Sequence, residues 1–224
     1  MATSSLLTNV EAALGMAVTL GYASKAKQHD LYEAYVLTLL LQAAHNDGWT
    51  LTLRDGWGGR VTSAMFRLGP GRLYSRDYTL VHMSKSGKSD LEAHLGVKVS
   101  GKTPVSVSAM TGSSRLLHEF DLLVLPAAEA DACRAGNNDP DHSVVIVHAE
   151  MKYFGGKLSL PVGRASVGMA VECDLAGKSV LVTNNLGYSV QDLVEHHGIA
   201  FRFRVLPTNP TAEHHVVKRF RSLL

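Results

Sequence analysis

The sequence predicts an α/β fold in which one mixed sheet is flanked by helices on both faces. Helical patterns occupy the first 45 residues, and short β-rich segments broken by glycine follow up to residue 126. Beyond residue 144 the patterns run strand, helix, strand, helix, strand, helix. Because this order does not alternate from the start, it favours a mixed sheet over a doubly wound parallel one.

The composition indicates a single globular domain over residues 1–224. Of these residues, 46% are hydrophobic and 19% are charged, which is ordinary for a chain with one large core. The N-terminal stretch lacks a basic leading segment and carries Glu11, so it predicts an amphipathic helix and not a signal peptide. The longest apolar run, 31–44, is too short to span a bilayer and contains Glu33. We therefore expect a cytoplasmic protein without membrane partners.

Cysteine content and charge limit the chemistry further. Cys133 and Cys173 lie 40 positions apart, which argues against a zinc knuckle and against a disulfide framework. The formal net charge is +2, yet the last 24 residues hold five basic side chains and one acidic side chain. Such a basic end fits a position beside phosphates, although a solvated terminal helix gives the same count.

The first half of the chain begins with two predicted helices. The first covers about 8–27. The second covers about 31–45, with Asp30 as its N-cap and the Asn-Asp-Gly turn at 46–48 as its end. The short segments that follow predict a meander or edge strands. These segments are 49–53, 63–69, 78–84 and 91–101.

Two longer strand patterns then lie on either side of a polar, turn-rich loop at 129–142. They are HEFDLLVLP at 118–126 and VVIVHAEMKYF at 144–154. We expect residues 8–27 and 200–224 to be additions to the core. The remaining predicted elements are a helix from Pro161 to about 174, a strand at 179–184, a short helix capped by Ser189 and Asp192 and closed by Gly198, a strand at 200–207, and a helix from about Thr211.

Charged side chains interrupt both long strand patterns. Residues two apart in a strand share a face, so Glu150 and Lys152 project together, while Asp121 lies on the other strand. On the helix at 31–45, Glu33 lies about 180° around the axis from Gln42 and should point inward. Three carboxylates near one lysine fit a hard, oxygen-ligated cation such as Mg²⁺. A structural salt bridge from Lys152 to Asp121 or Glu150 is the alternative.

This arrangement resembles the PD-(D/E)xK nuclease superfamily, whose fold is restriction-endonuclease-like. The resemblance rests on Asp121, on Glu150-Met151-Lys152 and on the helical Glu33, and covers roughly residues 30–185. It implies that Asp121, Glu150 and the Met151 backbone carbonyl ligate the metal. It also implies that Lys152 orients or helps deprotonate the attacking water and that Glu33 holds a second metal or its water shell.

The resemblance also implies the reaction and the partners. We expect a Mg²⁺-dependent nuclease, with Mn²⁺ as a substitute, that hydrolyses DNA phosphodiester bonds, and RNA stays open as a substrate. The run LYEAYVLTLLLQAA at 31–44 also resembles the first helix of phage-defence nuclease domains, which suggests defence against foreign DNA or a role in a mobile element. A homodimer or a larger assembly, with a partner supplying target recognition, would cut both strands. The family's usual proline is replaced by Phe120.

Four more residues lie near this pattern. Arg164 either reaches substrate phosphate or is a surface arginine, and His148 and His118 are either structural or acid–base groups. Glu119 could replace Asp121 as a ligand. Two rival functions also stay open: a catalytically silent, nuclease-like nucleic-acid-binding or assembly subunit, and a module that binds a small cationic ligand.

Two other motifs are rejected. The stretch SKSGKSD at 84–90 ends like a phosphate-binding loop, but His82 stands where the leading glycine is required. The pairs His196-His197 and His214-His215 cannot aim both rings at one metal from adjacent helical positions. We expect these histidines to be exposed on helices.

Overall fold

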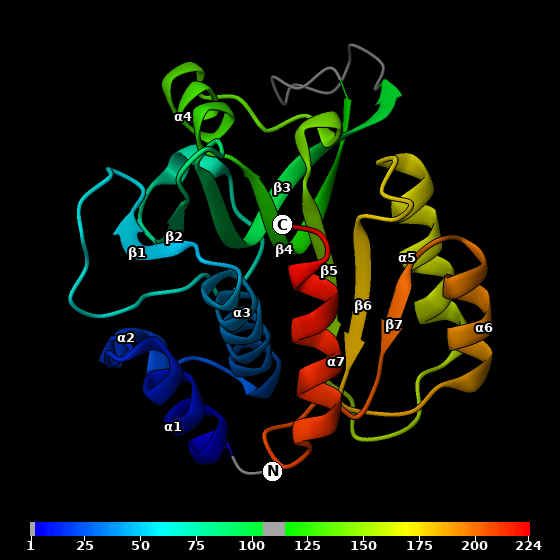
Figure 1. Ribbon diagram of the computed structural model, residues 1–224. Helices are drawn as coiled ribbons and strands as arrows, with labels where there is room; N and C mark the ends of the chain where they lie inside the picture. The colour runs from blue at the N-terminus through cyan, green and yellow to red at the C-terminus, as the bar shows by residue number, and fades with distance from the viewer. Residues whose placement is uncertain (1–2, 105–114) are drawn as a thin grey trace.

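The computed structural model describes residues 3–104 and 115–224 and contains one seven-stranded mixed sheet (Figure 1). The strands lie in the order β1 to β7; neighbours from β1 to β5 are antiparallel, whereas β5, β6 and β7 are parallel. The strands are β1 (Thr50–Asp55), β2 (Thr79–Ser84), β3 (Leu91–Pro104), β4 (Arg115–Pro126), β5 (Val147–Lys152), β6 (Ser179–Thr183) and β7 (Ala200–Arg202).

Helices cover both faces of this sheet, as the sequence predicted. One core lies between the sheet and α1, α3 and α7, and a second core lies on the other face under α4, α5 and α6. Figure 1 shows α3 and α7 side by side and α5 beside α6. The helices are α1 (Thr3–Leu14), α2 (Leu20–Ala23), α3 (Gln28–Asn46), α4 (Ala127–Gly136), α5 (Leu160–Glu172), α6 (Tyr188–His196) and α7 (Pro210–Arg221), with short 3₁₀ turns at Leu73–Ser75 and His142–Val144.

Helix α3 is the central helix of the first core. It begins before Asp30, the expected N-cap, and the Asp30 carboxylate instead accepts the backbone N–H of Lys27 at 2.6 Å from inside the first turn. Thr38 is buried and donates its hydroxyl to the Tyr35 carbonyl at 2.7 Å. Within the two described ranges, no helix is both long enough and apolar enough to cross a membrane.

The prediction of one continuous N-terminal helix over 8–27 is wrong. The chain turns at Gly15, whose φ of +65° is in the left-handed region, and the segment becomes two helices, α1 and α2. The Glu11 carboxylate holds the turn by accepting the Val18 N–H at 3.0 Å. Helical periodicity continues across this glycine, so it did not reveal the break.

Several other boundaries also differ from those expected. Residues 63–69 form only an isolated bridge at Ala64 and are not a strand, and the polar loop at 129–142 contains most of α4. The last strand is shorter than 200–207, because it ends at Arg202 and Arg204 then adopts a φ of +54°. At the later helices, α6 begins directly after Gly187, with Ser189 and Asp192 inside it, and Asn209 caps α7.

The sheet forks between β4 and β5. These two strands pair only from Val124↔Val147 to Leu122↔Ala149. Beyond that point β4 stays beside β3 as far as Arg115, while β5 stays beside β6 as far as Lys152. The next residues on the two diverging strands are Asp121 and Glu150. The fork therefore places both predicted acidic residues at its vertex.

A glycine in β3 marks the same level of the sheet. Gly96 lies opposite Asp121, between the pairs Leu95↔Leu122 and Val97↔Phe120, and has a φ of +60°. On one side of it Leu95 packs into the first core, whereas on the other side Val97 packs into the second. Since alternate residues of a regular strand share a face, the strand must bend here. This bend carries the far end of β4 away from β5.

Candidate active site

The vertex of the fork holds a carboxylate that replaces a missing ladder bond. Past Leu122↔Ala149, the backbone N–H of Met151 does not bond a backbone carbonyl of β4 and donates instead to the side-chain Oδ2 of Asp121 at 2.7 Å. The Met151 side chain is in the first core, on the opposite face from Glu150 and Lys152. The strand geometry thus fixes Asp121 against the backbone of the Glu150–Lys152 segment.

Lys152 joins the two carboxylates. Its Nζ lies 2.6 Å from Glu150 Oε1 and 3.1 Å from Asp121 Oδ2. The side chains of both acids are 11% exposed and that of Lys152 is 30% exposed. Burial alone would lower the lysine pKa, but the charges of Asp121 and Glu150 outweigh it and raise that pKa above its ordinary value. The ammonium is therefore held protonated.

Negative charge nevertheless exceeds positive charge at this point. Burial raises the pKa of Glu150, and the negative charge of Asp121 raises it further. Glu150 Oε1 is bound by Lys152, whereas Glu150 Oε2 is buried and has no hydrogen-bond partner among the described residues. A buried carboxylate oxygen without a donor is unfavourable, so this atom is available to a cation or to a water bound to one.

Glu33 approaches the same cluster from α3. It is half-buried, and no hydrogen bond or ion pair joins it to another described residue. Burial is the largest cause that raises its pKa to about 9, and the charge of Asp121 is the next, while Lys152 acts in the opposite direction. The sequence expectation that Glu33 points inward is consistent with this burial and with its electrostatic coupling to Asp121.

His148 lies next to Glu150, and its hydrogen-bond partner, Ser179, was not predicted from the sequence. The ring is buried, packs against Phe120 with centroids 4.3 Å apart, and its Nδ1 lies 2.8 Å from Ser179 Oγ. Its Nε2 is 3.9 Å from Glu150 Oε2. Burial, and then the Lys152 charge, lower the His148 pKa to about 3, so the ring is neutral. A polar Ser179 at the start of the apolar strand β6 was the available signal, because parallel register pairs it with His148.

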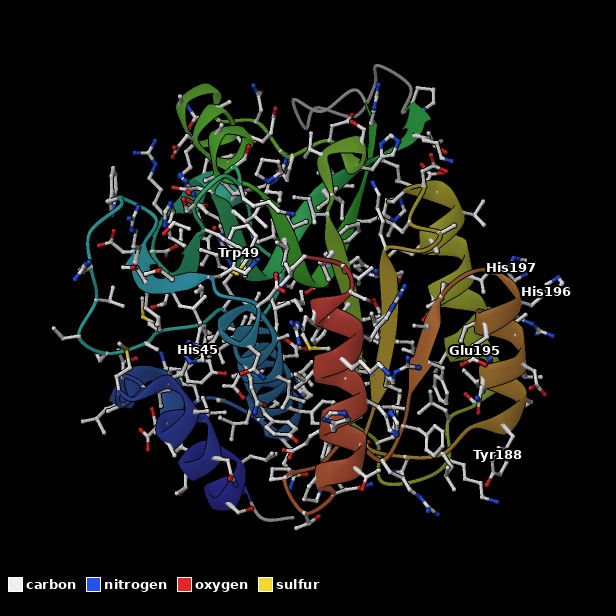
Figure 2. All side chains as sticks on the ribbon, in the orientation of Figure 1. His45, Trp49, Tyr188, Glu195, His196 and His197 are labelled. Carbon is white, nitrogen blue, oxygen red and sulfur yellow. The ribbon has the colours of Figure 1, made fainter. Side chains whose placement is uncertain are left out.

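Among the remaining candidates, Glu119 acts on the cluster through its negative charge, which contributes to the raised pKa of Glu150 and of Glu33, whereas Arg164 and His118 form no hydrogen bond or ion pair with it in the described residues. Arg164 is exposed on α5, and within the described residues it forms no ion pair. Glu119 is exposed on the β4 arm, and His118 lies 3.9 Å from Glu172. The histidine pairs are exposed as expected, and Figure 2 shows His196 and His197 at the outer end of α6.

The donor set suits a hard cation that keeps much of its water. No group of three His, Cys, Asp or Glu side chains within 3–104 and 115–224 is arranged to hold a metal ion. Mg²⁺, however, is commonly bound through only one or two carboxylates, with waters and substrate phosphate completing its shell. Asp121 and Glu150, with the unpaired Oε2 atom, supply such a pair. The site therefore fits Mg²⁺ better than it fits Zn²⁺, which is usually held by histidine or cysteine side chains, and neither type contributes a ligand here.

Comparison with known proteins adds no relative: no family model, no curated protein and no solved structure matches this chain.

Proposed function

We propose that this chain is a metal-dependent nuclease that hydrolyses DNA phosphodiester bonds at the fork between β4 and β5. The observation that carries the proposal is the convergence of Asp121, Glu150 and Lys152 at the point where the two strands separate. The resemblance of this pattern to PD-(D/E)xK nucleases supports the reaction class. The mixed sheet flanked by helices is compatible with the restriction-endonuclease-like fold that we propose for it.

In this proposal, Asp121, Glu150 and the Met151 backbone carbonyl hold Mg²⁺, and Glu33 supports a second ion or its water shell. The bound cation would stabilise the charge that develops on the phosphate and lower the pKa of a bound water. Lys152 keeps its proton, so it orients the attacking water and stabilises negative charge and does not act as the base. His148, whose Nε2 lies 3.9 Å from Glu150 Oε2, and Arg164 are the candidates for contacts with the substrate.

The proposal extends to assembly and setting. One site of this kind cuts one strand, so cleavage of a duplex requires a homodimer or a partner protein. We propose a cytoplasmic role in defence against foreign DNA or in a mobile element, by analogy with nucleases of this pattern.

Cleavage of supercoiled plasmid tests the function. The wild type should nick or linearise the plasmid with Mg²⁺ or Mn²⁺ and not with EDTA, and Lys152→Ala should abolish the activity. Lys88→Ala is the matched control, because Lys88 is exposed in the turn between β2 and β3. This turn lies at one edge of the sheet, and the C-terminal ends of β1, β3 and β5 lie at the other. Equal cleavage by both variants would place any activity outside the fork.

One observation favours a second candidate, a catalytically silent nucleic-acid-binding subunit. Lys152 already bridges both carboxylates, and such an ion-pair cluster stands without any metal. A silent subunit would bind DNA equally well with Mg²⁺ and with EDTA and would cut under neither condition. Metal-dependent cleavage by the purified chain excludes it.

A further inference from the structure

An exposed tryptophan stands at the tip of a short arginine-flanked loop after β1. The segment RDGWGGR, residues 54–60, folds back on itself, and Arg54 and Arg60 face each other in an antiparallel bridge. Trp57 at the apex is 73% exposed. A large aromatic side chain gains stability from burial, so one left in solvent on a turn marks a contact surface.

The loop holds Trp57 rigidly. Asp55 Oδ1 accepts the backbone N–H groups of Trp57 and Gly59, each at 2.9 Å, and the Gly58 N–H donates to the Asp55 carbonyl at 3.0 Å. Gly58 has a φ of +88°, which suits glycine. The loop backbone that carries the indole is therefore ordered before any partner arrives, which reduces the entropy lost on binding.

One face of the indole carries a guanidinium. The Arg76 Cζ lies 4.6 Å from the Trp57 ring centroid, and Arg76 has a φ of +66°, which is rare for a residue with a side chain. Its carbonyl accepts the Gly56 N–H at 3.0 Å, and a Cβ on Gly56 would lie 2.3 Å from the Arg76 Cα. Two unusual backbone features thus place this cation on the ring, and such strain is concentrated at functional sites.

Among the described residues, arginines without a carboxylate partner surround Trp57, and acidic side chains share the hollow beside it. In the described part of the chain, Arg54, Arg60 and Arg76 form no ion pair, and the Asp55 carboxylate is engaged by the loop's own N–H groups. The hollow beside the ring, about 240 Å³, is lined by the arginines Arg54, Arg76 and Arg134 and by the acids Asp55, Glu92 and Asp131, of which Glu92 and Asp131 pair with Arg134. An apolar protein partner would find few contacts there. An aromatic face among arginines matches nucleic acid, where bases stack and phosphates meet cations.

The loop opens at the same edge of the sheet as the fork. Strands β1, β3 and β5 run in the same direction because each neighbouring pair from β1 to β5 is antiparallel. The loop follows the C-terminal end of β1, and Glu150 and Lys152 lie at the C-terminal end of β5. Four strand spacings separate β1 from β5, which is about 19 Å along the sheet. Several nucleotides of one strand span such a distance.

We propose that Trp57 and Arg76, with Arg54 and Arg60, form a stacking platform that binds an unpaired base and its flanking phosphates in single-stranded nucleic acid. The platform holds one strand of the substrate while the fork cuts it. The choice of ligand rests on the proposed nuclease function, whereas the platform itself rests on the geometry of the loop.

The fluorescence of Trp57 can report on binding directly. It has two tryptophans, and Trp49 is 3% exposed, between α3 and the sheet (Figure 2). A Trp49→Phe variant therefore reports on Trp57 alone. Titration with oligo(dT), oligo(U) and a matched duplex, in EDTA to prevent cleavage, should quench its fluorescence with either single strand and much less with the duplex. Tighter binding of oligo(dT) or of oligo(U) identifies DNA or RNA as the ligand.

Substitutions separate stacking from charge. Trp57→Ala should weaken single-strand binding by at least about fivefold, and Trp57→Phe, which keeps a ring, should weaken it less. Arg60→Gln should weaken binding and reduce its dependence on salt. Unchanged binding by Trp57→Ala, or a duplex that binds more tightly than both single strands without quenching, overturns the platform.

The two proposals fail in different ways. If plasmid is cut but Trp57 fluorescence does not respond to any nucleic acid, the platform is wrong and the nuclease stands. If single strands quench Trp57 in the wild-type background and in Lys152→Ala, while neither protein cuts, the platform stands and the cleavage function is wrong.

Discussion

Replacing Lys152 with methionine should destabilise the metal-free protein far more than its exposure suggests. The change keeps the aliphatic stem and removes a charge that neutralises two acids, each 11% exposed. Breaking a buried ion pair costs about 3–5 kcal/mol, because a charge is left buried and unpaired. Since the Lys152 side chain is 30% exposed, water offsets part of that loss. We expect the free energy of unfolding to fall by about 2 kcal/mol.

A second lysine gives a matched control. Lys85 is 28% exposed and pairs with Asp47 at 2.8 Å, but the Asp47 side chain is 25% exposed. Lys85→Met should therefore cost less than Lys152→Met, because Asp47 lies at the surface and keeps its pair with Arg221 at 3.3 Å. Urea unfolding in EDTA at about pH 8 measures both values. Equal losses in the two variants would refute the reasoning, because they would mean that the acids at the fork are as well solvated as a surface aspartate.

A second substitution should restore part of the stability that Lys152→Met loses. Adding Glu150→Gln to Lys152→Met removes one of the stranded charges, so the double variant should be more stable than the single one by at least about 1 kcal/mol. Mg²⁺ should also stabilise Lys152→Met, because the cation replaces the missing ammonium between the same carboxylates. A double variant less stable than Lys152→Met would show that the two carboxylates do not repel each other.

Three more predictions follow from the fork and its support. The Glu33 pKa of about 9 exceeds its unfolded value, so folding retains a proton that unfolding releases, and stability falls as pH rises between these values. Glu33→Gln removes this dependence. The free energy of unfolding of the variant, relative to that of the wild type, should therefore rise by up to about 4 kcal/mol from about pH 5 to pH 8, measured by urea unfolding in EDTA. A difference that stays constant with pH contradicts this. Gly96→Ala places a Cβ 3.1 Å from the Gly69 carbonyl at a positive φ, whereas Gly87→Ala has a positive φ with nothing within 4 Å. Thermal unfolding should show that Gly96→Ala loses more stability than Gly87→Ala, by about 1 kcal/mol or more, and only Gly96→Ala should cleave plasmid more slowly. Equal losses of stability would mean that the bend tolerates a side chain. Ser179→Ala leaves the His148 Nδ1 without its partner and should cost about 1–3 kcal/mol in urea unfolding; an unchanged midpoint would show that water reaches the ring.

The direction in which Glu150, Lys152 and Glu33 point was predictable because it depends on local periodicity. Glu150 and Lys152 are two apart in an apolar strand, so they had to share a face, and the helical angle placed Glu33 on the inner side of α3. The burial of Asp121 followed from the apolar sequence around it. These inferences need only the repeat of one element, and the hydrophobic pattern gives that repeat directly.

The fork itself was not predictable, because it depends on strand pairing. Which residues of β4 leave β5 is decided by the bend at Gly96, a residue on a third strand. The break at Gly15 was missed because the amphipathic pattern continues beyond it. Helix α4 was missed because its charged residues and the turn-forming residues after it were taken as one loop, although its alanines favour a helix and Ala130 packs in the second core. Only the fork depends on tertiary contacts, because the local propensities at Gly15 and in α4 agree with the structure.

The most direct test is the initial rate of plasmid nicking at saturating Mg²⁺ by wild type and by Glu150→Gln, a change that keeps the shape of the side chain and removes its charge. If the fork holds the catalytic cation, the rate should fall by at least about 100-fold, which corresponds to nearly 3 kcal/mol of transition-state stabilisation. A Glu150→Gln protein that folds normally and nicks plasmid at the wild-type rate would show that the chemistry, if present, lies elsewhere in the chain.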